Sequence, residues 1–326
     1  MCSVQELLNF TAHKFTAQLR ISNMHIPVLL KEVIDLLNPQ PNENFIDCTL
    51  GFTGHSQAIL EKTKPNGRVL GIEWDEEKLK TKNEKLKTEE RLLVVNDSYA
   101  NLKDIVEREK FYPVSGILLD LGMSSWDLEQ SGRGFSFQKD EPLDMRYAVQ
   151  SAKCKVKNLT AEEIINKWPE IEIARILREY GQERFAKNIA SNIVNVRRQK
   201  PIETTFQLVE VIRKSFPRSY KFGRQPFATR TFQALRIAVN DELANLQKVL
   251  PPALEVLRLE GKLLVISFHS LEDRIVKNFF RDQQKQKNLQ ILTKKPIMAS
   301  LAEIKENPRV RSAKLRAAVV NYKLSF

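Results

Sequence analysis

Short apolar segments that end on or beside an acidic residue recur through the first 120 residues and alternate with stretches of helical spacing. This alternation is typical of parallel strands joined by helices in a doubly wound α/β sheet. Because parallel strands end at the same edge of a sheet, we expect their terminal acids to gather where open α/β folds bind ligands. The predicted strands are 44–49, 68–73, 91–96 and 114–120, and the predicted helices are 25–38, 56–62 and 75–90.

The alternation stops at residues 131–230, which contain helical stretches and no convincing strand pattern. It then resumes, so the simplest organisation is one α/β domain, residues 25–130 and 231–326, split by an all-helical insertion at 131–230. The helices predicted in the insertion are 161–168, 172–180, 185–198 and 205–215. The later predicted elements are a helical region at 231–259 interrupted near 251–252, a strand at 261–267, a helix at 271–280, a loop or frayed helix end at 281–288 and a strand from 316.

The remaining segment, residues 1–24, is predicted to be an N-terminal extension. A transit peptide is the alternative, since Lys14 and Arg20 stand against Glu6. This segment lacks the basic-then-apolar pattern of a secretory signal, and no apolar run approaches the roughly 20 residues that span a bilayer. We therefore expect a cytoplasmic protein without membrane contact.

Cysteine and histidine usage adds two expectations. Cys2, Cys48 and Cys154 are well separated and form no CxxC pair, so neither a disulfide framework nor a zinc site is predicted. The four histidines are scattered in the same way, and no metal site is predicted. A reducing compartment fits this pattern.

Four features at the predicted strand ends indicate a cofactor site. Gly51 and Gly54 lie in the loop after the first strand, where glycine lets the backbone approach a ligand closely. Glu73 ends the second strand, the usual place for an acceptor of a ribose diol. Tyr99 follows the third strand and offers a ring for an adenine face, and Asp120 ends the fourth. Each feature alone also fits an ordinary turn or strand-end acid, so their joint occurrence carries the prediction.

The loop between Gly51 and Gly54 distinguishes two cofactors. Its GxxG spacing is not the GxGxxG fingerprint that admits a dinucleotide pyrophosphate. S-adenosylmethionine has no phosphate and tolerates a looser loop, while it still needs a diol acceptor and an adenine slot. The spacing therefore favours S-adenosylmethionine over NAD.

The net charge of +12 is concentrated in one part of the chain. Residues 184–236 hold twelve Lys/Arg against two acids, Glu203 and Glu210, an excess of +10. One-sided charge of this kind favours a polyanionic partner, with nucleic acid as the usual one, over a basic but otherwise ordinary surface.

Nine motifs, in order from about residue 25 to the C-terminus, resemble those of one family, the bacterial N4-cytosine methyltransferases of small-subunit ribosomal RNA (the RsmH or MraW family). The motifs are His25-Ile-Pro-Val-Leu-Leu, Thr53-Gly-His-Ser, Leu119-Asp-Leu-Gly-Met-Ser-Ser, Arg133-Gly-Phe-Ser-Phe, Pro142-Leu-Asp-Met-Arg, Tyr180-Gly-Gln-Glu-Arg-Phe-Ala, Ala228-Thr-Arg-Thr-Phe-Gln-Ala-Leu-Arg, Ile266-Ser-Phe-His-Ser-Leu-Glu-Asp-Arg and Asn307-Pro-Arg-Val-Arg-Ser-Ala-Lys-Leu-Arg.

The resemblance implies a Rossmann-like S-adenosylmethionine-dependent methyltransferase sheet with an inserted all-helical domain that faces RNA. It implies methyl transfer from S-adenosylmethionine to the exocyclic N4 of a cytidine in the decoding region of 16S ribosomal RNA. The expected partner is this RNA or the small ribosomal subunit; the oligomeric state, a homodimer included, stays open. By motif position, the family's cofactor contacts fall on Thr53, Gly54, His55, Glu73, Tyr99, Asp120 and Asp127.

Several of these positions depart from the family's common residues. Thr53 replaces the glycine that is common in the family, Glu73 replaces aspartate and Tyr99 replaces phenylalanine. These changes keep the needed chemistry. Trp126-Asp127 replaces Pro-Gln, which turns an amide into a group that only accepts hydrogen bonds. The contact carried over to Asp127 is therefore the least secure.

Asp120 is the best catalytic candidate, although no general base can be named from the sequence. The cytosine N4 amine is a poor nucleophile, so catalysis needs close in-line placement and an acceptor for its N–H groups. Asp120 fits either that role or a cofactor contact, with the cofactor contact first. Phe135 and Phe137 fit a stacking surface for the extruded base or anchors of their loop equally well, and His269 fits a structural hydrogen bond at least as well as a place in the site.

Two other classes of function predict different sequence patterns. An NAD-dependent oxidoreductase requires the complete glycine fingerprint and a histidine or tyrosine–lysine catalytic pair, and neither pattern is found. A non-catalytic RNA-binding or assembly factor would keep the basic insertion and lose the cofactor pocket. The retained Gly54, Glu73 and Asp120 argue against that class.

Overall fold

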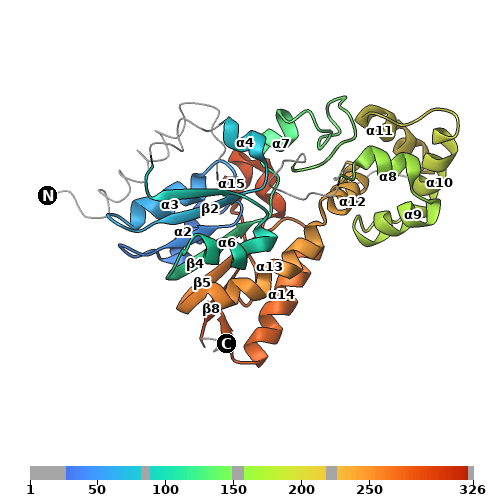
Figure 1. Cartoon of the computed structure of the whole chain (residues 1–326). Helices are drawn as coiled ribbons and strands as arrows, with labels where there is room; N and C mark the ends of the chain where they lie inside the picture. Colours follow the sequence, from blue (N-terminus) through green and yellow to red (C-terminus); the bar gives the residue numbers. More distant parts are fainter. Residues whose placement is uncertain (1–26, 82–88, 149–157, 218–225, 322–326) are drawn as a thin grey trace.

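The computed structural model describes residues 27–81, 89–148, 158–217 and 226–321, so the predicted N-terminal extension lies outside the described residues. A twisted sheet with helices on its faces forms the larger body, and helices α8 to α11 gather to one side of it (Figure 1). The predicted α/β fold with an all-helical insertion is confirmed.

The described part of the chain forms a sheet of eight strands in the order β3-β2-β1-β4-β5-β8-β6, with β7 also pairing with β8. Strands β3 through β5 in that order are parallel, and β8 runs antiparallel to its neighbours, as in a Rossmann-like fold with an antiparallel edge. Chain order reverses between β1 and β4, where ligands of such sheets bind. The strands are β1 (Phe45–Asp47), β2 (Val69–Glu73), β3 (Leu92–Asn96), β4 (Val114–Asp120), β5 (Leu257–Ser267), β6 (Leu289–Ile291), β7 (Ile297–Met298) and β8 (Lys314–Val320).

Helices cover both faces of the sheet, so its parallel strands are buried on both sides. Ile46 and Ile117 pack into the core beneath α6, α13 and α14. Their neighbours Phe45 and Leu118 point to the opposite face, beneath α2 and α3. The helices around the sheet are α2 (Leu30–Leu37), α3 (Gly54–Lys62), α4 (Glu76–Lys80), η1 (Tyr99–Asn101), α6 (Leu102–Arg108), α7 (Ser125–Glu129), α13 (Glu242–Val256), α14 (Ser270–Lys285), α15 (Leu301–Glu306) and η2 (Pro308–Ser312).

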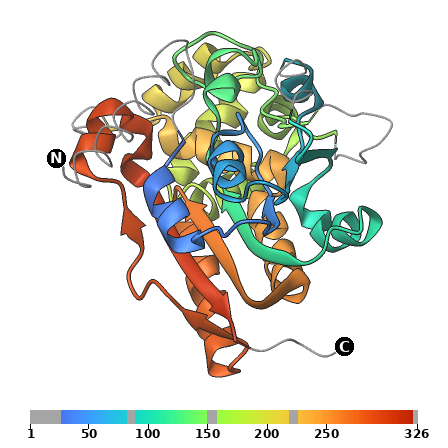
Figure 2. The same ribbon diagram turned by 90° about the vertical axis from the view of Figure 1, so that its left-hand side faces the viewer.

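The insertion has an apolar core of its own, which includes the wholly buried Ile164, Ile193 and Leu208. Thr204 begins α11 with a capping box, in which its hydroxyl and the Gln207 side chain bond each other's backbone N–H. Figure 2 looks from the sheet side, with the yellow-green helices of the insertion behind the sheet. The helices are α8 (Ala161–Lys167), α9 (Glu170–Glu179), α10 (Ala186–Arg197), α11 (Thr205–Lys214) and α12 (Thr229–Asn240).

The predicted domain boundary between residues 230 and 231 would assign most of α12 to the α/β domain, although α12 packs in the core of the insertion. Phe232, Leu235 and Val239 of α12 join the core of the insertion. Packing therefore groups α12 with the helical side of the molecule, and the division at 131–230 stays a prediction.

The predicted interruption near Pro251 and Pro252 is wrong. Both prolines lie inside α13, which continues to Val256. The break falls instead at Asp241, whose φ of 50° is left-handed and ends α12. Proline normally interrupts a helix, but here wholly buried residues such as Leu250 pack the proline-containing turn onto the sheet.

Other predicted bounds also change. Helix α14 continues to Lys285, through most of the predicted loop at 281–288, and α4 covers only the start of the predicted helix 75–90, whose residues 82–88 lie outside the described part. The short β6 and β7 carry too few residues for a periodic pattern and were not predicted. Within the described ranges no helix has the length and apolar character needed to cross a membrane.

Candidate cofactor and substrate site

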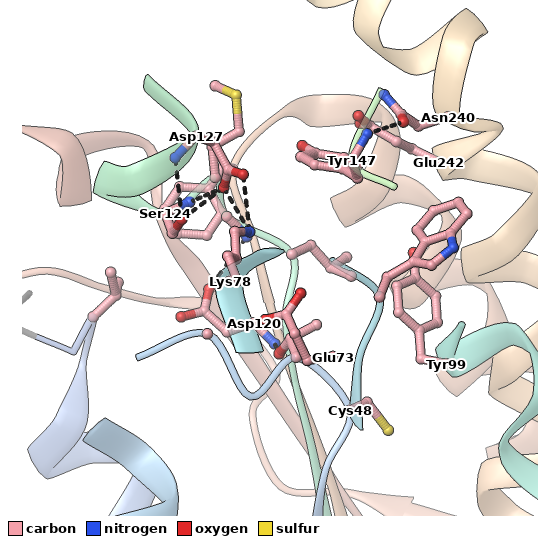
Figure 3. A pocket seen from close by; sticks show the side chains of 18 of the residues that line it. Cys48, Glu73, Lys78, Tyr99, Asp120, Ser124, Asp127, Tyr147, Asn240 and Glu242 are labelled. Carbon is pink, nitrogen blue, oxygen red and sulfur yellow. Dashed lines mark hydrogen bonds and ion pairs between the residues drawn. The ribbon is translucent and has the colours of Figure 1, made fainter. Parts of the chain in front are cut away.

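A cavity opens at the carboxyl ends of β2 and β4, between the sheet and the insertion (Figure 3). Four of the seven predicted cofactor contacts line it: Glu73, Tyr99, Asp120 and Asp127. The other three, Thr53, Gly54 and His55, lie at the start of α3 behind the cavity wall. The structure thus gathers the strand-end residues, and all seven remain predictions as cofactor contacts.

Asp120 ends β4 at the cavity. Its backbone N–H donates to Thr49 Oγ1 at 2.7 Å, and its Oδ1 accepts the N–H of Gly122 at 3.3 Å. Burial raises the pKa of Asp120 to about 6, although the nearby His55 and the Gly122 N–H act to lower it. This carboxylate is therefore ionised at neutral pH and changes charge just below it.

His55 lies beside Asp120, and Gly54 packs against Pro27. His55 Nε2 lies 2.9 Å from the Val28 carbonyl, which makes Nε2 the donor, while Nδ1 lies 3.9 Å from Asp120 Oδ2. A Cβ at Gly54 would stand 2.2 Å from Cγ of Pro27, so this glycine permits close packing. The Thr53-Gly54-His55 motif therefore has a structural role here whatever it contacts in a complex.

Glu73 ends β2 and points into the cavity (Figure 3). Its Oε1 accepts the N–H of Asp75 at 3.0 Å, which orients the carboxylate. The next residue, Trp74, also lines the cavity and was missed from the sequence. The sequence did offer a signal for Trp74, because it directly follows the predicted ribose acceptor Glu73. A ring at that position would lie beside a ligand of Glu73.

Tyr99 begins η1 on the same side of the cavity as Glu73. Burial is the main cause that raises the pKa of its hydroxyl, so the ring stays neutral. The nearby Asp97 does not line the cavity; its Oδ1 accepts from the Ser98 N–H and the Asn101 side chain. Tyr99 is therefore the part of this segment that faces the cavity.

Asp127 lines the cavity while its oxygens are already engaged. It forms a capping box with Ser124 at the start of α7, and its Oδ1 lies 2.9 Å from Lys78 Nζ. Lys78 comes from α4 and was not singled out from the sequence. Nothing in the local pattern of α4 separates it from the exposed Lys80 on the same helix.

The wall on the insertion side, which Tyr147, the end of α12 and the start of α13 form, was also missed. The Asn240 side chain accepts the Tyr147 N–H at 2.8 Å and donates to the Met145 carbonyl at 2.7 Å. Glu242 pairs in two contacts, at 2.7 and 2.9 Å, with Arg236. Asn240 and Glu242 lie at least 120 positions beyond the strand-end acids Glu73 and Asp120, and no local signal connects them.

Phe135 and Phe137 anchor their loop. Phe135 is buried and stacks on Tyr147, with ring centroids 5.1 Å apart, and Phe137 meets the edge of Phe232 at 5.4 Å. Both pack in or against the core of the insertion. Of the two interpretations open from the sequence, the structure supports anchoring.

Arg133 fastens that loop to the sheet. Its guanidinium donates to Asp75 Oδ2 at 2.9 Å and to the Tyr147 carbonyl at 2.9 Å, and both Arg133 and Asp75 are buried. Since the Asp75 N–H also holds Glu73, the end of β2 and the loop of the insertion form one connected unit.

The structure brings together one His/Glu group that the scattered histidines did not predict. Ligand-type atoms of Glu242, His269 and Glu272 lie within 4.8 Å of one another. His269 begins α14 with a capping box, in which its Nδ1 accepts the Glu272 N–H and Glu272 Oε2 accepts the Phe268 and His269 N–H groups. Because this capping box already occupies His269 Nδ1 and Glu272 Oε2, the group fits a helix start better than a metal ion.

The charge of the cavity favours a cationic ligand. Glu73, Asp120 and Glu272 have no Lys or Arg within 4.0 Å among the described residues. The acids with such partners are Asp127, beside Lys78, and Glu242, beside Arg236. A sulfonium or ammonium group would gain from the three remaining carboxylates.

Comparison with known proteins assigns the chain to a family. The model of the MraW methylase family matches residues 22–321. The chain belongs to this family. It is 46% identical over 311 residues to the ribosomal RNA small subunit methyltransferase H of Heliobacterium mobile, covering 90% of this chain and 98% of that one. Proteins of the same name from Symbiobacterium thermophilum and Kosmotoga olearia are each 44% identical and cover 90% and 92% of this chain, and 96% and 99% of their own.

Membership of the MraW methylase family confirms the resemblance and makes the departure at Trp126 and Asp127 informative. Trp126 is buried, and Lys78 and Arg133 lie over its ring at 5.9 and 5.2 Å from the centroid. These contacts tie α7 to α4 and to the loop of the insertion. In this member of the family, the departure thus goes together with a buried Lys78–Asp127 ion pair.

Proposed function

We propose that this chain transfers a methyl group from S-adenosylmethionine to the exocyclic N4 of a cytidine in the decoding region of 16S ribosomal RNA. The observation that carries the proposal is the acidic cavity at the ends of β2 and β4, in a chain of the MraW methylase family and beside a basic helical insertion. The names of the curated relatives support the small subunit as the origin of the RNA.

The residues of the cavity fit this cofactor. Glu73 offers an acceptor to a ribose diol, and Tyr99 and Trp74 offer rings beside an adenine. The carboxylates without a Lys or Arg partner suit a ligand that carries a sulfonium charge. S-adenosylmethionine supplies an electrophilic methyl group, and Thr53, Gly54 and His55 hold the loop behind it.

Asp120 contributes to the reaction through its position at the carboxyl end of β4, where it lines the cavity. As a carboxylate it first serves as a cofactor contact, and it is also the described acid best placed to accept hydrogen bonds from the N4 amine. Holding the amine in line contributes more than proton removal, since positioning alone accounts for a large part of such barriers. No described residue is assigned as general base.

The insertion supplies affinity for RNA phosphates. Arg184, Lys187, Arg198, Lys200 and Lys214 are exposed on α10, α11 and their flanks, with no carboxylate within 4.0 Å among the described residues. Three further basic residues of the predicted patch, Arg218, Lys221 and Arg224, lie outside the described ranges. Such contacts position the RNA, while the cavity selects the base. A ribosomal substrate supports a cytoplasmic location.

Two measurements test the proposal. The first is equilibrium binding of S-adenosylmethionine to the wild type and to Asp120→Ala. We expect the wild type to bind clearly and Asp120→Ala to bind more weakly. If the wild type does not bind, the proposal that the protein is an enzyme is refuted. Methylated nucleotides of 16S ribosomal RNA are then mapped with and without the protein, as free RNA and as assembled subunit. An unmodified decoding-region cytidine in both substrates would refute the substrate assignment.

A further inference from the structure

Lys78 is a buried ammonium inside the proposed cofactor cavity. Its side chain is 8% exposed, lines the cavity, and lies in Figure 3 with Asp127 on one side and Glu73 on the other. The rings of Trp126 and Tyr147 flank Nζ at 5.9 and 5.8 Å. A lysine rarely occupies such a place without a partner or a ligand.

Asp127 cannot contact a ligand in the way an amide at this position would. Its Oδ2 accepts from the Ser124 N–H at 2.8 Å, from Ser124 Oγ at 2.7 Å and from Lys78 Nζ at 3.0 Å. Its Oδ1 lies 2.9 Å from the same Nζ. Because a carboxylate donates no hydrogen bond, the donor that an amide would offer the cavity has to come from another residue.

Lys78 is the described residue that can supply this donor. The ammonium has three N–H groups, and its hydrogen bonds within the described residues all go to Asp127. Burial lowers the pKa of Lys78, but Glu73 and Asp127 outweigh it and raise the pKa to about 12, so the group stays charged. Glu73 is close enough to act on this pKa, yet no oxygen of Glu73 lies within 4.0 Å of Nζ among the ion pairs of the described residues.

We propose that Lys78 is a cofactor-binding residue whose ammonium donates a hydrogen bond to a ribose hydroxyl of S-adenosylmethionine, the hydroxyl that in turn donates to Glu73. The inference rests on the proposed function, since it concerns the same cavity. Asp127 then acts as a positioning residue that holds the ammonium in place.

A hydroxyl fits between these two groups for a simple reason. A carboxylate only accepts and an ammonium only donates, whereas a hydroxyl does both and can satisfy the two together. Hydrogen bonds to charged groups are stronger than those between neutral groups, so this bridge would contribute substantially to affinity. The contact would be made to the nucleoside part of the cofactor and not to its amino-acid part.

The experiment is titration calorimetry of the full-length protein with S-adenosylmethionine, S-adenosylhomocysteine and 5′-methylthioadenosine, which lacks the amino-acid part. Lys78→Met is compared with Lys80→Met, which removes an exposed lysine from the same helix; among the described residues Lys80 forms an ion pair with Glu76 at 3.1 Å. We expect Lys78→Met to weaken all three ligands by roughly 10-fold or more, and Lys80→Met to leave them unchanged.

A second variant keeps the test decisive if the unpaired Asp127 destabilises the protein. Lys78→Met combined with Asp127→Leu leaves no buried lone charge and no side-chain donor at either position, and thermal unfolding shows whether it is folded. Wild-type affinity in this folded double variant would overturn the proposal. Weakening confined to ligands with the amino-acid part would also overturn it, since the contact would then be to the carboxylate. If the wild type binds none of the three ligands, the proposed function fails first.

Discussion

The two walls of the cavity use their polar groups in opposite ways. On the sheet side, Glu73 and Asp120 stand at strand ends with no Lys or Arg within 4.0 Å among the described residues. On the insertion side, Asn240 holds the backbone of the loop at Tyr147, and Glu242 holds Arg236. One wall therefore presents charge to a ligand, while the other uses its polar groups to hold the helices together.

This difference separates the consequences of mutation. Removing a charge from the sheet wall should reduce binding or catalysis and leave folding largely intact, because among the described residues no Lys or Arg within 4.0 Å would lose its partner. Removing a group from the insertion wall should leave a largely buried polar group without its partner, and should therefore reduce the free energy of unfolding first. The following predictions test that separation, beginning with the largest effect.

Arg236→Met should destabilise the protein by about 3–5 kcal/mol, because it leaves Glu242, whose side chain is 11% exposed, without its partner. Burial lowers the pKa of Arg236 and Glu242 outweighs it, so the guanidinium is firmly charged. Urea unfolding measures the change, with Arg230→Met on the same helix as a control, since Arg230 donates to the Gln182 carbonyl at the surface. A free energy of unfolding equal to that of the wild type would show that the insertion wall is not structural.

Asp120→Asn should lower methyl transfer to small-subunit RNA by about 100-fold while leaving stability unchanged or slightly higher. The variant keeps the shape of the side chain and removes a charge that burial disfavours. Incorporation of labelled methyl groups measures the rate, and Asp35→Asn, at an exposed position of α2, is the matched control. Loss of stability in place of activity would put Asp120 with the insertion wall.

Acid should reduce the activity of the wild type through the same residue. The pKa of Asp120 is about 6, so its ionised fraction falls about tenfold per pH unit below that value. The folded pKa lies above the ordinary value, so the folded state binds this proton more tightly and gains stability through Asp120 as the pH falls from about 7 to 4. As the pH falls, the rate of methyl transfer should therefore decrease while the contribution of Asp120 to the free energy of unfolding increases. Asp120→Asn should remove both of these pH dependences.

The sequence predicted the sheet wall well because its residues are local in the chain. Glu73 and Asp120 each end an apolar strand, and a short continuous apolar run followed by an acid locates such a residue without knowledge of the fold. The helices of the insertion were predicted for a similar reason, since the apolar spacing of α8 to α11 is regular. The wrong break at Pro251 shows the limit of that reasoning, because burial against the sheet outweighed the local preference of proline.

The rest of the site depends on contacts between distant segments. Lys78 and Asp127 meet across 49 positions and Tyr147 and Asn240 across 93, and neither pair leaves a local pattern. His55 was assigned to the cofactor by motif position, whereas the structure places its ring against Val28 and Asp120. Motif position therefore located residues in and around the cavity, without distinguishing those that line it from those that lie behind its wall.

The smallest predicted effect concerns the exposed basic face, which belongs to neither wall. Lys200→Ala should weaken binding of small-subunit RNA only a few-fold, because a single phosphate contact at an exposed site contributes little, and should lower the salt slope of log affinity by about 1. Filter binding at several salt concentrations measures both, with Lys285→Ala on α14 as the control. Because Lys200 is exposed and has no carboxylate partner among the described residues, stability and cofactor affinity should not change. An unchanged salt slope would show that the RNA does not cross this face, and the insertion would then contribute its cavity wall and not its charge.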